Sequence, residues 1–128
     1  MAIFHVAKNG NNKNDGSASA PFFTIQKAAD IASAGDTIIV HEGEYREWVK
    51  PKNSGNSHTQ RITYEAAKGE HVMIKGSEIV TNWEKVEACV WKVTVPNTLF
   101  GDFNPFATEL MGDWVVAPYN NPVHLGDV

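Results

Sequence analysis

The 128-residue sequence has one cysteine, no cluster of basic residues and no apolar run of membrane-spanning length. Cys89 has no second cysteine to pair with, so an intramolecular disulfide is excluded and the chain is compatible with a reducing compartment. The 11 lysines and arginines stand singly among 15 acidic residues, whereas a nucleic-acid surface clusters its basic side chains. We therefore expect no nucleic-acid partner and no membrane partner.

The N-terminal residues 1–7 have no basic segment ahead of a long apolar stretch, so they do not match a secretory signal peptide. Together with the lone cysteine, this favours a cytoplasmic location. Secretion after removal of a leader is the alternative, because a chain without its leader would have the same sequence.

The signatures of metal and cofactor chemistry are also missing. The sequence contains no G-x-G-x-x-G motif and no P-loop, and the asparagine-rich segment 9–15 does not fit the calcium-loop pattern. No two histidines stand at zinc-ligand spacing. We expect neither a metal nor a cofactor, and we expect Cys89, in an apolar setting, to be a buried inert thiol. The five histidines are His5, His41, His58, His71 and His124.

One helix is predicted, at about residues 24–33. Thr24 is a suitable N-cap, and the apolar residues that follow have the i, i+3, i+4, i+7 spacing of one helical face. Gly35 is expected to stop the helix. Small side chains dominate this face, so the helix can approach a flat surface closely and cover it. The face consists of Ile25, Ala28, Ala29 and Ala32.

The rest of the chain is predicted to be mainly β, as one domain over residues 1–128. Short β-prone clusters alternate with turn-forming residues, which suits a stacked coil but also a sandwich of hairpins. The segment 3–7 is a further short strand, and one more is expected at 114–117. The clusters are 38–40, 45–49, 62–64, 72–74, 79–80 and 90–95.

Three motifs resemble the N-terminal entry of right-handed parallel β-helix proteins of the pectate-lyase-like class. They are APFFTIQKAAD at 20–30, AGDTIIV at 34–40 and GEYRE at 43–47. The resemblance implies that the helix at about 24–33 caps the open end of a β-helix and that the two following motifs form its first coil. The segment KGEHVMIKGSE at 68–78 is similar to the next coils.

The motifs GDFNPF at 101–106 and GDW at 112–114 resemble the β-xylosidase-like branch, family 120 of the glycoside hydrolases. This implies that the chain is the N-terminal cap and scaffold of a longer hydrolase acting on plant-type oligosaccharides. The family's catalytic carboxylates lie on later coils, so no catalytic residue is transferred to this chain, and the segment alone is expected to be inactive. A second copy of the chain could cover the open end of the β-helix.

Four residues are candidates for contact with a carbohydrate. Arg46 and Trp48 alternate along a predicted strand and could form a sugar-binding edge, with the indole stacking on a pyranose. Glu47 belongs to the densest acidic group, and His41 follows a predicted strand. The competing interpretation pairs Arg46 with Glu44 or Glu47, packs Trp48 beneath the 51–60 loop and leaves His41 solvated or bound to backbone.

Two other functions remain open. A non-catalytic carbohydrate-binding or structural module needs only an aromatic face and no paired carboxylates. A polysaccharide lyase of the pectate-lyase kind needs clustered carboxylates that hold calcium, and this chain has no aspartate between Asp36 and Asp102.

Overall fold

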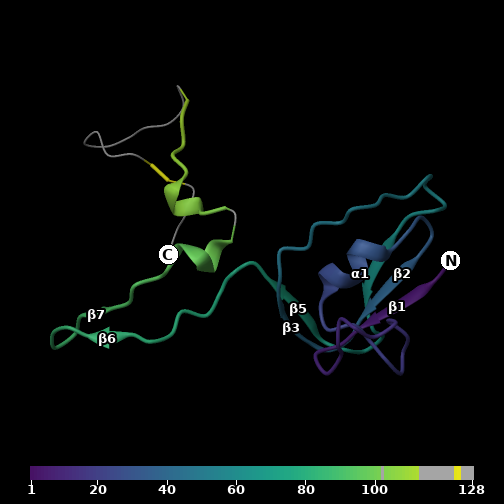
Figure 1. The fold of residues 1–128 in the computed structure, drawn as a ribbon, viewed down its shortest axis with the longest axis horizontal. Coiled ribbons are helices and arrows are strands. Elements are labelled where there is room, and N and C mark those ends of the chain that lie inside the picture. The colour runs from purple at the N-terminus through teal and green to yellow at the C-terminus, as the bar shows by residue number, and fades with distance from the viewer. Residues whose placement is uncertain (102, 113–122, 125–128) are drawn as a thin grey trace. The chain divides into compact units, whose positions relative to one another are not determined.

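The computed structural model describes residues 1–101, 103–112 and 123–124, and contacts divide the chain into two units, Met1–Glu78 and Ile79–Val128. The described residues are mainly β with one α-helix (Figure 1). That class was predicted. The single domain over 1–128 stays a prediction, because contact density does not test whether the units fold separately. No helix in the described ranges has the length and apolar character needed to cross a membrane.

The first unit contains two parallel sheets. The strands β1 (Ile3–Val6), β2 (Thr37–Val40) and β4 (Thr63–Ala66) form one sheet in the order β1-β2-β4. The strands β3 (Gly43–Arg46) and β5 (Val72–Lys75) form the other. All these pairs are parallel, as for Ile3 opposite Thr37 and Thr37 opposite Thr63. The alternative of hairpins is therefore wrong for this unit, because hairpin strands pair antiparallel.

The helix α1 (Ile25–Ile31) is shorter than its predicted range of about 24–33. Thr24 is the N-cap, as predicted, and its hydroxyl oxygen accepts a hydrogen bond from the backbone N–H of Lys27 at 3.2 Å. The helix ends before Gly35 because Ala32 already has an extended ψ of 142°. Its apolar face is buried as expected, with Ala28 and Ala32 fully inaccessible, and the helix packs against β1 and β2.

The loop between β1 and α1 encloses the ring of Phe22, which is buried in the core. Gly16 has a φ of +82°, and a Cβ atom there would stand only 2.2 Å from that ring. The loop can therefore close over Phe22 only with glycine at this position. Asn12 holds the far side of the loop, since its side-chain oxygen accepts from the backbone N–H groups of Phe23 and Thr24.

Every buried residue of the described chain lies between Val6 and Tyr45. The later strands β4 and β5 pair with this core but contain no buried residue. The core therefore sits in the first half of the unit, while β4 and β5, the last strands of their two sheets, contain only exposed or half-buried residues. The core cluster consists of Val6, Phe22, Ile25, Ala28, Ala32, Ile38, Val40 and Tyr45.

The second unit contains an antiparallel pair, β6 (Glu84–Lys85) and β7 (Trp91–Lys92), and two 3-10 helices, η1 (Asn97–Phe100) and η2 (Pro105–Ala107). The strand predicted at 79–80 is absent, and only Trp91–Lys92 of the range 90–95 is a strand. Cys89 is exposed at the turn of this hairpin, so the prediction of a buried thiol is wrong. The predicted strand at 114–117 lies outside the described residues.

Candidate functional site

A line of three titratable side chains crosses successive segments of the first unit. His5 lies on β1, His41 directly follows β2, and Glu70 lies in the turn between β4 and β5. Parallel pairing of β1, β2 and β4 brings these segments side by side, because each chain segment repeats the direction of the one before. The sequence gives no sign of this alignment, since 36 and 29 positions separate consecutive members.

The contacts within this line are short. His5 Nδ1 lies 2.9 Å from His41 Nε2, and the ring planes differ by 20° with centroids 5.2 Å apart. His41 Nδ1 lies 3.1 Å and 3.2 Å from the two carboxylate oxygens of Glu70. The backbone N–H of Glu42 also donates to Glu70 at 2.7 Å, so the carboxylate is held from two directions.

The surroundings lower the pKa values of both His5 and Glu70. Partial burial, and then the charge of His41, lowers the pKa of His5 below 6.5. The hydrogen bond from the Glu42 backbone, and then the contact with His41, lowers the pKa of Glu70 below 4.5. Glu70 is therefore ionised near neutral pH and can only accept hydrogen bonds.

A second polar group lies on the β3-β5 sheet. Arg46 Nη2 and Lys75 Nζ contact the two carboxylate oxygens of Glu44 at 2.6 Å and 2.5 Å. Arg46 also donates to the backbone oxygen and the hydroxyl of Ser77. Hydrogen bonding from Lys75, followed by the charges of Arg46 and Lys75, lowers the pKa of Glu44. The predicted pairing of Arg46 with Glu44 is confirmed.

Glu47 contacts the first turn of α1 instead of an open surface. Its two carboxylate oxygens accept from the backbone N–H groups of Ile25 and Gln26 at 3.1 Å and 3.0 Å. These N–H groups have no partner within the helix. A carboxylate accepts their hydrogen bonds and is itself stabilised by the positive end of the helix dipole. Glu47 therefore fixes α1 to the segment that follows β3.

Trp48 differs from the other three candidates because its side chain is 76 % exposed. The alternative that packs it beneath the 51–60 loop is therefore wrong. Arg46, Glu47 and His41 each use polar atoms on protein partners, and the structure brings no two of the four candidates into a hydrogen bond or ion pair. Their contact with a sugar stays a prediction.

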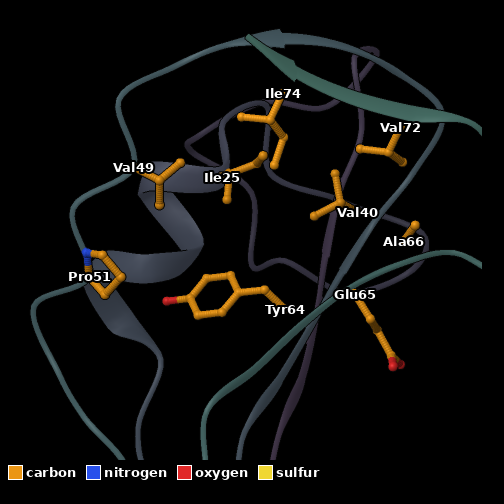
Figure 2. Close-up of a pocket in the computed structure, with 9 residues that line it drawn as sticks. All are labelled: Ile25, Val40, Val49, Pro51, Tyr64, Glu65, Ala66, Val72 and Ile74. Atoms are coloured by element: carbon orange, nitrogen blue, oxygen red, sulfur yellow. The ribbon is translucent and has the colours of Figure 1, made fainter. Parts of the chain in front are cut away.

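An apolar groove of about 480 Å³ lies between the helix and the strands β4 and β5. Figure 2 shows the aliphatic side chains and the ring of Tyr64 facing one another across it, while the carboxylate of Glu65 points away. Partial burial raises the pKa of Tyr64. The groove offers van der Waals contact but few polar groups. Its lining residues are Ile25, Val40, Val49, Pro51, Tyr64, Glu65, Ala66, Val72 and Ile74.

No three histidine, cysteine or carboxylate side chains in the part of the chain that the structure describes are grouped closely enough to hold a metal ion. The two clusters that were not predicted, His5–His41–Glu70 and the groove, both depend on the register of the parallel strands. A β-prone pattern gives the strands but not which strand lies beside which. The spacing of the histidines in the sequence therefore contains no signal for this contact.

Known proteins resemble both parts of the chain. Residues 80–128 match the family model described as glycoside hydrolase 120, insertion domain. Residues 8–53 match a model described as a protein of unknown function, DUF1565. A solved structure, the complex of XylC with xylose, is 54% identical, covers 95% of this chain and has a TM-score of 0.87. The chain is a glycoside hydrolase family 120-like segment.

Two further relatives of the family 120-like segment are more distant. A solved structure described as a glycoside hydrolase is 24% identical over 75% of the chain with a TM-score of 0.57, which shows a shared fold. The uncharacterized protein YwoF of Bacillus subtilis (strain 168) is 35% identical over 75 residues, which is 59% of this chain. The segment spans only 19%, 18% and 16% of XylC, the glycoside hydrolase and YwoF.

Proposed function

We propose that this segment forms the N-terminal cap and first coils of a right-handed parallel β-helix in a β-xylosidase-like glycoside hydrolase. The observation that carries the proposal is the similarity to XylC, whose structure was solved with xylose and matches 95% of this chain at 54% identity. The substrate class that this favours is a plant-type oligosaccharide containing xylose.

The path of the chain supports the β-helix. It passes from the first sheet to the second with β2 and β3, and again with β4 and β5, and each new strand pairs in parallel with its predecessor in the same sheet. Connections between parallel strands of one sheet are right-handed in about 98% of cases. The helix α1 packs on β1 and β2 and serves as the cap.

In this architecture the apolar groove is part of the coil interior. Its walls include Tyr64 and Ile74, whose side chains are 37% and 59% exposed. Burial of exposed apolar groups stabilises the folded protein by about 25 cal/mol per Å² of apolar surface. We infer that a further coil of the same protein packs on this side, and that the groove is scaffold and not a ligand site.

The catalytic pair is proposed to lie elsewhere in the protein. A retaining glycosidase needs two carboxyl groups roughly 5 Å apart, one of them free to act as an acid. In this segment Glu44 is neutralised by two cations, Glu47 holds the helix and Glu70 is bound to His41. None of these three is free for proton transfer to a leaving group.

The test compares the natural full-length product with residues 1–128 alone in the hydrolysis of aryl xylosides. We expect the full-length product to release the aryl group and the segment to be inert. An inactive full-length product that nevertheless binds xylo-oligosaccharides would overturn the proposal and favour the non-catalytic binding module.

The exposed indole of Trp48 is the observation that favours this second candidate, because exposed aromatic rings stack on sugars. Calorimetric titration of the segment with xylo-oligosaccharides, for the wild type and for Trp48→Ala, tests it directly. The binding module requires affinity in the wild type that is lost in the variant, whereas a scaffold segment binds in neither case. Trp48→Phe, which keeps an aromatic face, is the matched control.

A further inference from the structure

The line of His5, His41 and Glu70 has one consistent arrangement of protons near neutral pH. The ionised carboxylate of Glu70 accepts, so His41 Nδ1 must carry its proton. A neutral His41 then has a lone pair on Nε2, and His5 must donate to it from Nδ1. This leaves a lone pair on His5 Nε2, at the end of the line that is farthest from Glu70.

We propose that these three side chains form a proton-accepting ladder. It holds one additional proton without losing a hydrogen bond, and its His5–His41 hydrogen bond breaks when a second proton is bound. This inference is independent of the proposed enzymatic function. It concerns the response of the first unit to acid, and it uses only the contacts of residues in that unit.

The first proton is accommodated by a shift along the ladder. When His5 Nε2 takes up a proton, the proton on His5 Nδ1 can pass over the 2.9 Å separation to His41 Nε2. His5 is then neutral with its proton on Nε2, and His41 is an imidazolium ion beside the Glu70 carboxylate. Both hydrogen bonds remain, one with its direction reversed, and the new positive charge is paired.

The second proton has no such arrangement. With both rings charged, two N–H donors face each other across the same separation, and the centroids of two positive rings are only 5.2 Å apart. The lowered pKa of His5, caused by burial and then by the charge of His41, agrees with this resistance to a second proton. The unfolded chain takes up that proton more readily. The contribution of the histidine pair to folding stability is therefore fully present above pH 6.5 and is lost as the pH falls through the folded-state pKa of His5.

Other charged and titratable groups surround the ladder. Glu42 lies next to His41 and contacts Glu70 through its backbone, and Tyr45 donates from its hydroxyl to the His41 carbonyl oxygen at 2.9 Å. Lys8, from the segment after β1, lies over the Tyr45 ring. Asp15 precedes Gly16, whose carbonyl accepts from the His5 backbone, and His71 follows Glu70. Within the described ranges, none of these other groups forms a side-chain hydrogen bond or ion pair with either imidazole ring, whose partners are one another and Glu70.

The experiment is nitrogen-15 NMR of the histidine rings in residues 1–128 from about pH 8 to about pH 4. We expect both ladder rings to carry the proton on Nδ1 at high pH, and His5 to move it to Nε2 as the pair takes up its first proton. His58, which is exposed, is the internal reference. Independent titration of both rings along the His58 curve, or a proton on Nε2 of either ring at high pH, would overturn the proposal.

Two variants and one control substitution separate the ladder from a general effect of acid. Glu70→Gln removes the negative charge and should lower the pH of the first proton uptake by about one unit. Glu78→Gln, a substitution of an exposed glutamate that follows β5, should leave it unchanged. His5→Gln keeps a donor that does not titrate, so it should reduce the fall in Tm between about pH 7 and about pH 5 by about 4 °C. An equal fall in wild type and His5→Gln would contradict the ladder.

Discussion

The two units of the chain differ in the burial of their apolar side chains. In Met1–Glu78, eight hydrophobic residues form a buried cluster, and two parallel sheets and a helix surround it. In Ile79–Val128, none of the described residues is buried, and Trp83, Trp91 and Met111 are 50%, 55% and 80% exposed. The first unit therefore encloses a core of its own, whereas the described part of the second has apolar surface without one.

The two units also differ in how far apart in the sequence their paired strands lie. The core of the first unit forms from strands distant in the sequence, because Phe4 pairs with Ile38 and Ile38 with Tyr64. The second unit's described strands are two residues long and adjacent in the sequence. A two-stranded hairpin of this size has little stability by itself in water. Matched substitutions in the two units should therefore have unequal effects.

The largest expected contrast is between two phenylalanines. Phe22→Ala removes a ring that is 1% exposed and should destabilise the first unit by about 3–5 kcal/mol, because a cavity remains where the ring packed. Phe103→Ala removes a ring that is 44% exposed and should cost less than about 1 kcal/mol. Urea unfolding measured by amide hydrogen exchange in β2 gives the first value. Similar losses from both substitutions would mean that the two units are stabilised alike.

The second contrast concerns side chains that cap helices. Glu47→Ala leaves the N–H groups of Ile25 and Gln26 without their acceptor and should cost about 1–2 kcal/mol, since α1 covers the core. Asn104 caps the short helix η2 in the second unit, where its side chain accepts from the Phe106 N–H at 2.9 Å. Asn104→Ala should cost less than about 0.5 kcal/mol, because no buried residue depends on η2.

The capping contrast is measured by thermal unfolding of both variants followed by circular dichroism. Glu78→Ala, a substitution of an exposed glutamate in the first unit, is the control for loss of charge. If Glu47→Ala unfolds like this control, the carboxylate does not stabilise the helix.

The third contrast is sensitivity to acid. The carboxylate of Asp36 accepts from the backbone N–H groups of Ala2 and Ser33 at 2.6 Å and 2.9 Å, and these bonds, in that order, lower its pKa below 3.8. Because the folded-state pKa is the lower one, this contribution to stability is present above pH 3.8 and is lost as the pH falls through the folded-state value. Asp36→Asn should reduce the slope with which the urea midpoint falls between about pH 4 and about pH 2. Glu87→Gln, in the second unit, should leave that slope intact.

The sequence predicted the local structure of the first unit better than that of the second. The N-cap Thr24, the helix and the strand at 38–40 all follow from short patterns, and the structure confirms them. In the second unit, the clusters at 79–80 and 90–95 have β-branched residues but form little or no strand. Propensity alone does not form a strand, because a strand also needs a partner and a surface on which to pack.

The candidate site was less predictable than the fold. Arg46 was singled out from alternation along a strand and Glu47 from the density of acidic residues, and the structure places Arg46 in the ion pair of the competing interpretation and Glu47 at the first turn of a helix. Both roles depend on segments that the register brings close, such as the first turn of α1. His5 and Glu70 could not be linked to His41 for the same reason, since the parallel register joins positions that the sequence separates by many residues.

The smallest expected effect lies in the hairpin of the second unit. Lys92 Nζ lies 3.6 Å from Glu84 Oε2, and the two side chains are 64% and 72% exposed. Exposed ion pairs contribute little because water screens the charges and both side chains lose freedom, so Glu84→Gln should change stability by less than about 0.5 kcal/mol. The measurement is amide hydrogen exchange at β6 and β7 in low and high salt. A clear loss of protection that high salt abolishes would show that charge, and not apolar packing, stabilises this hairpin, and the contrast between the units would then rest on a different force in each.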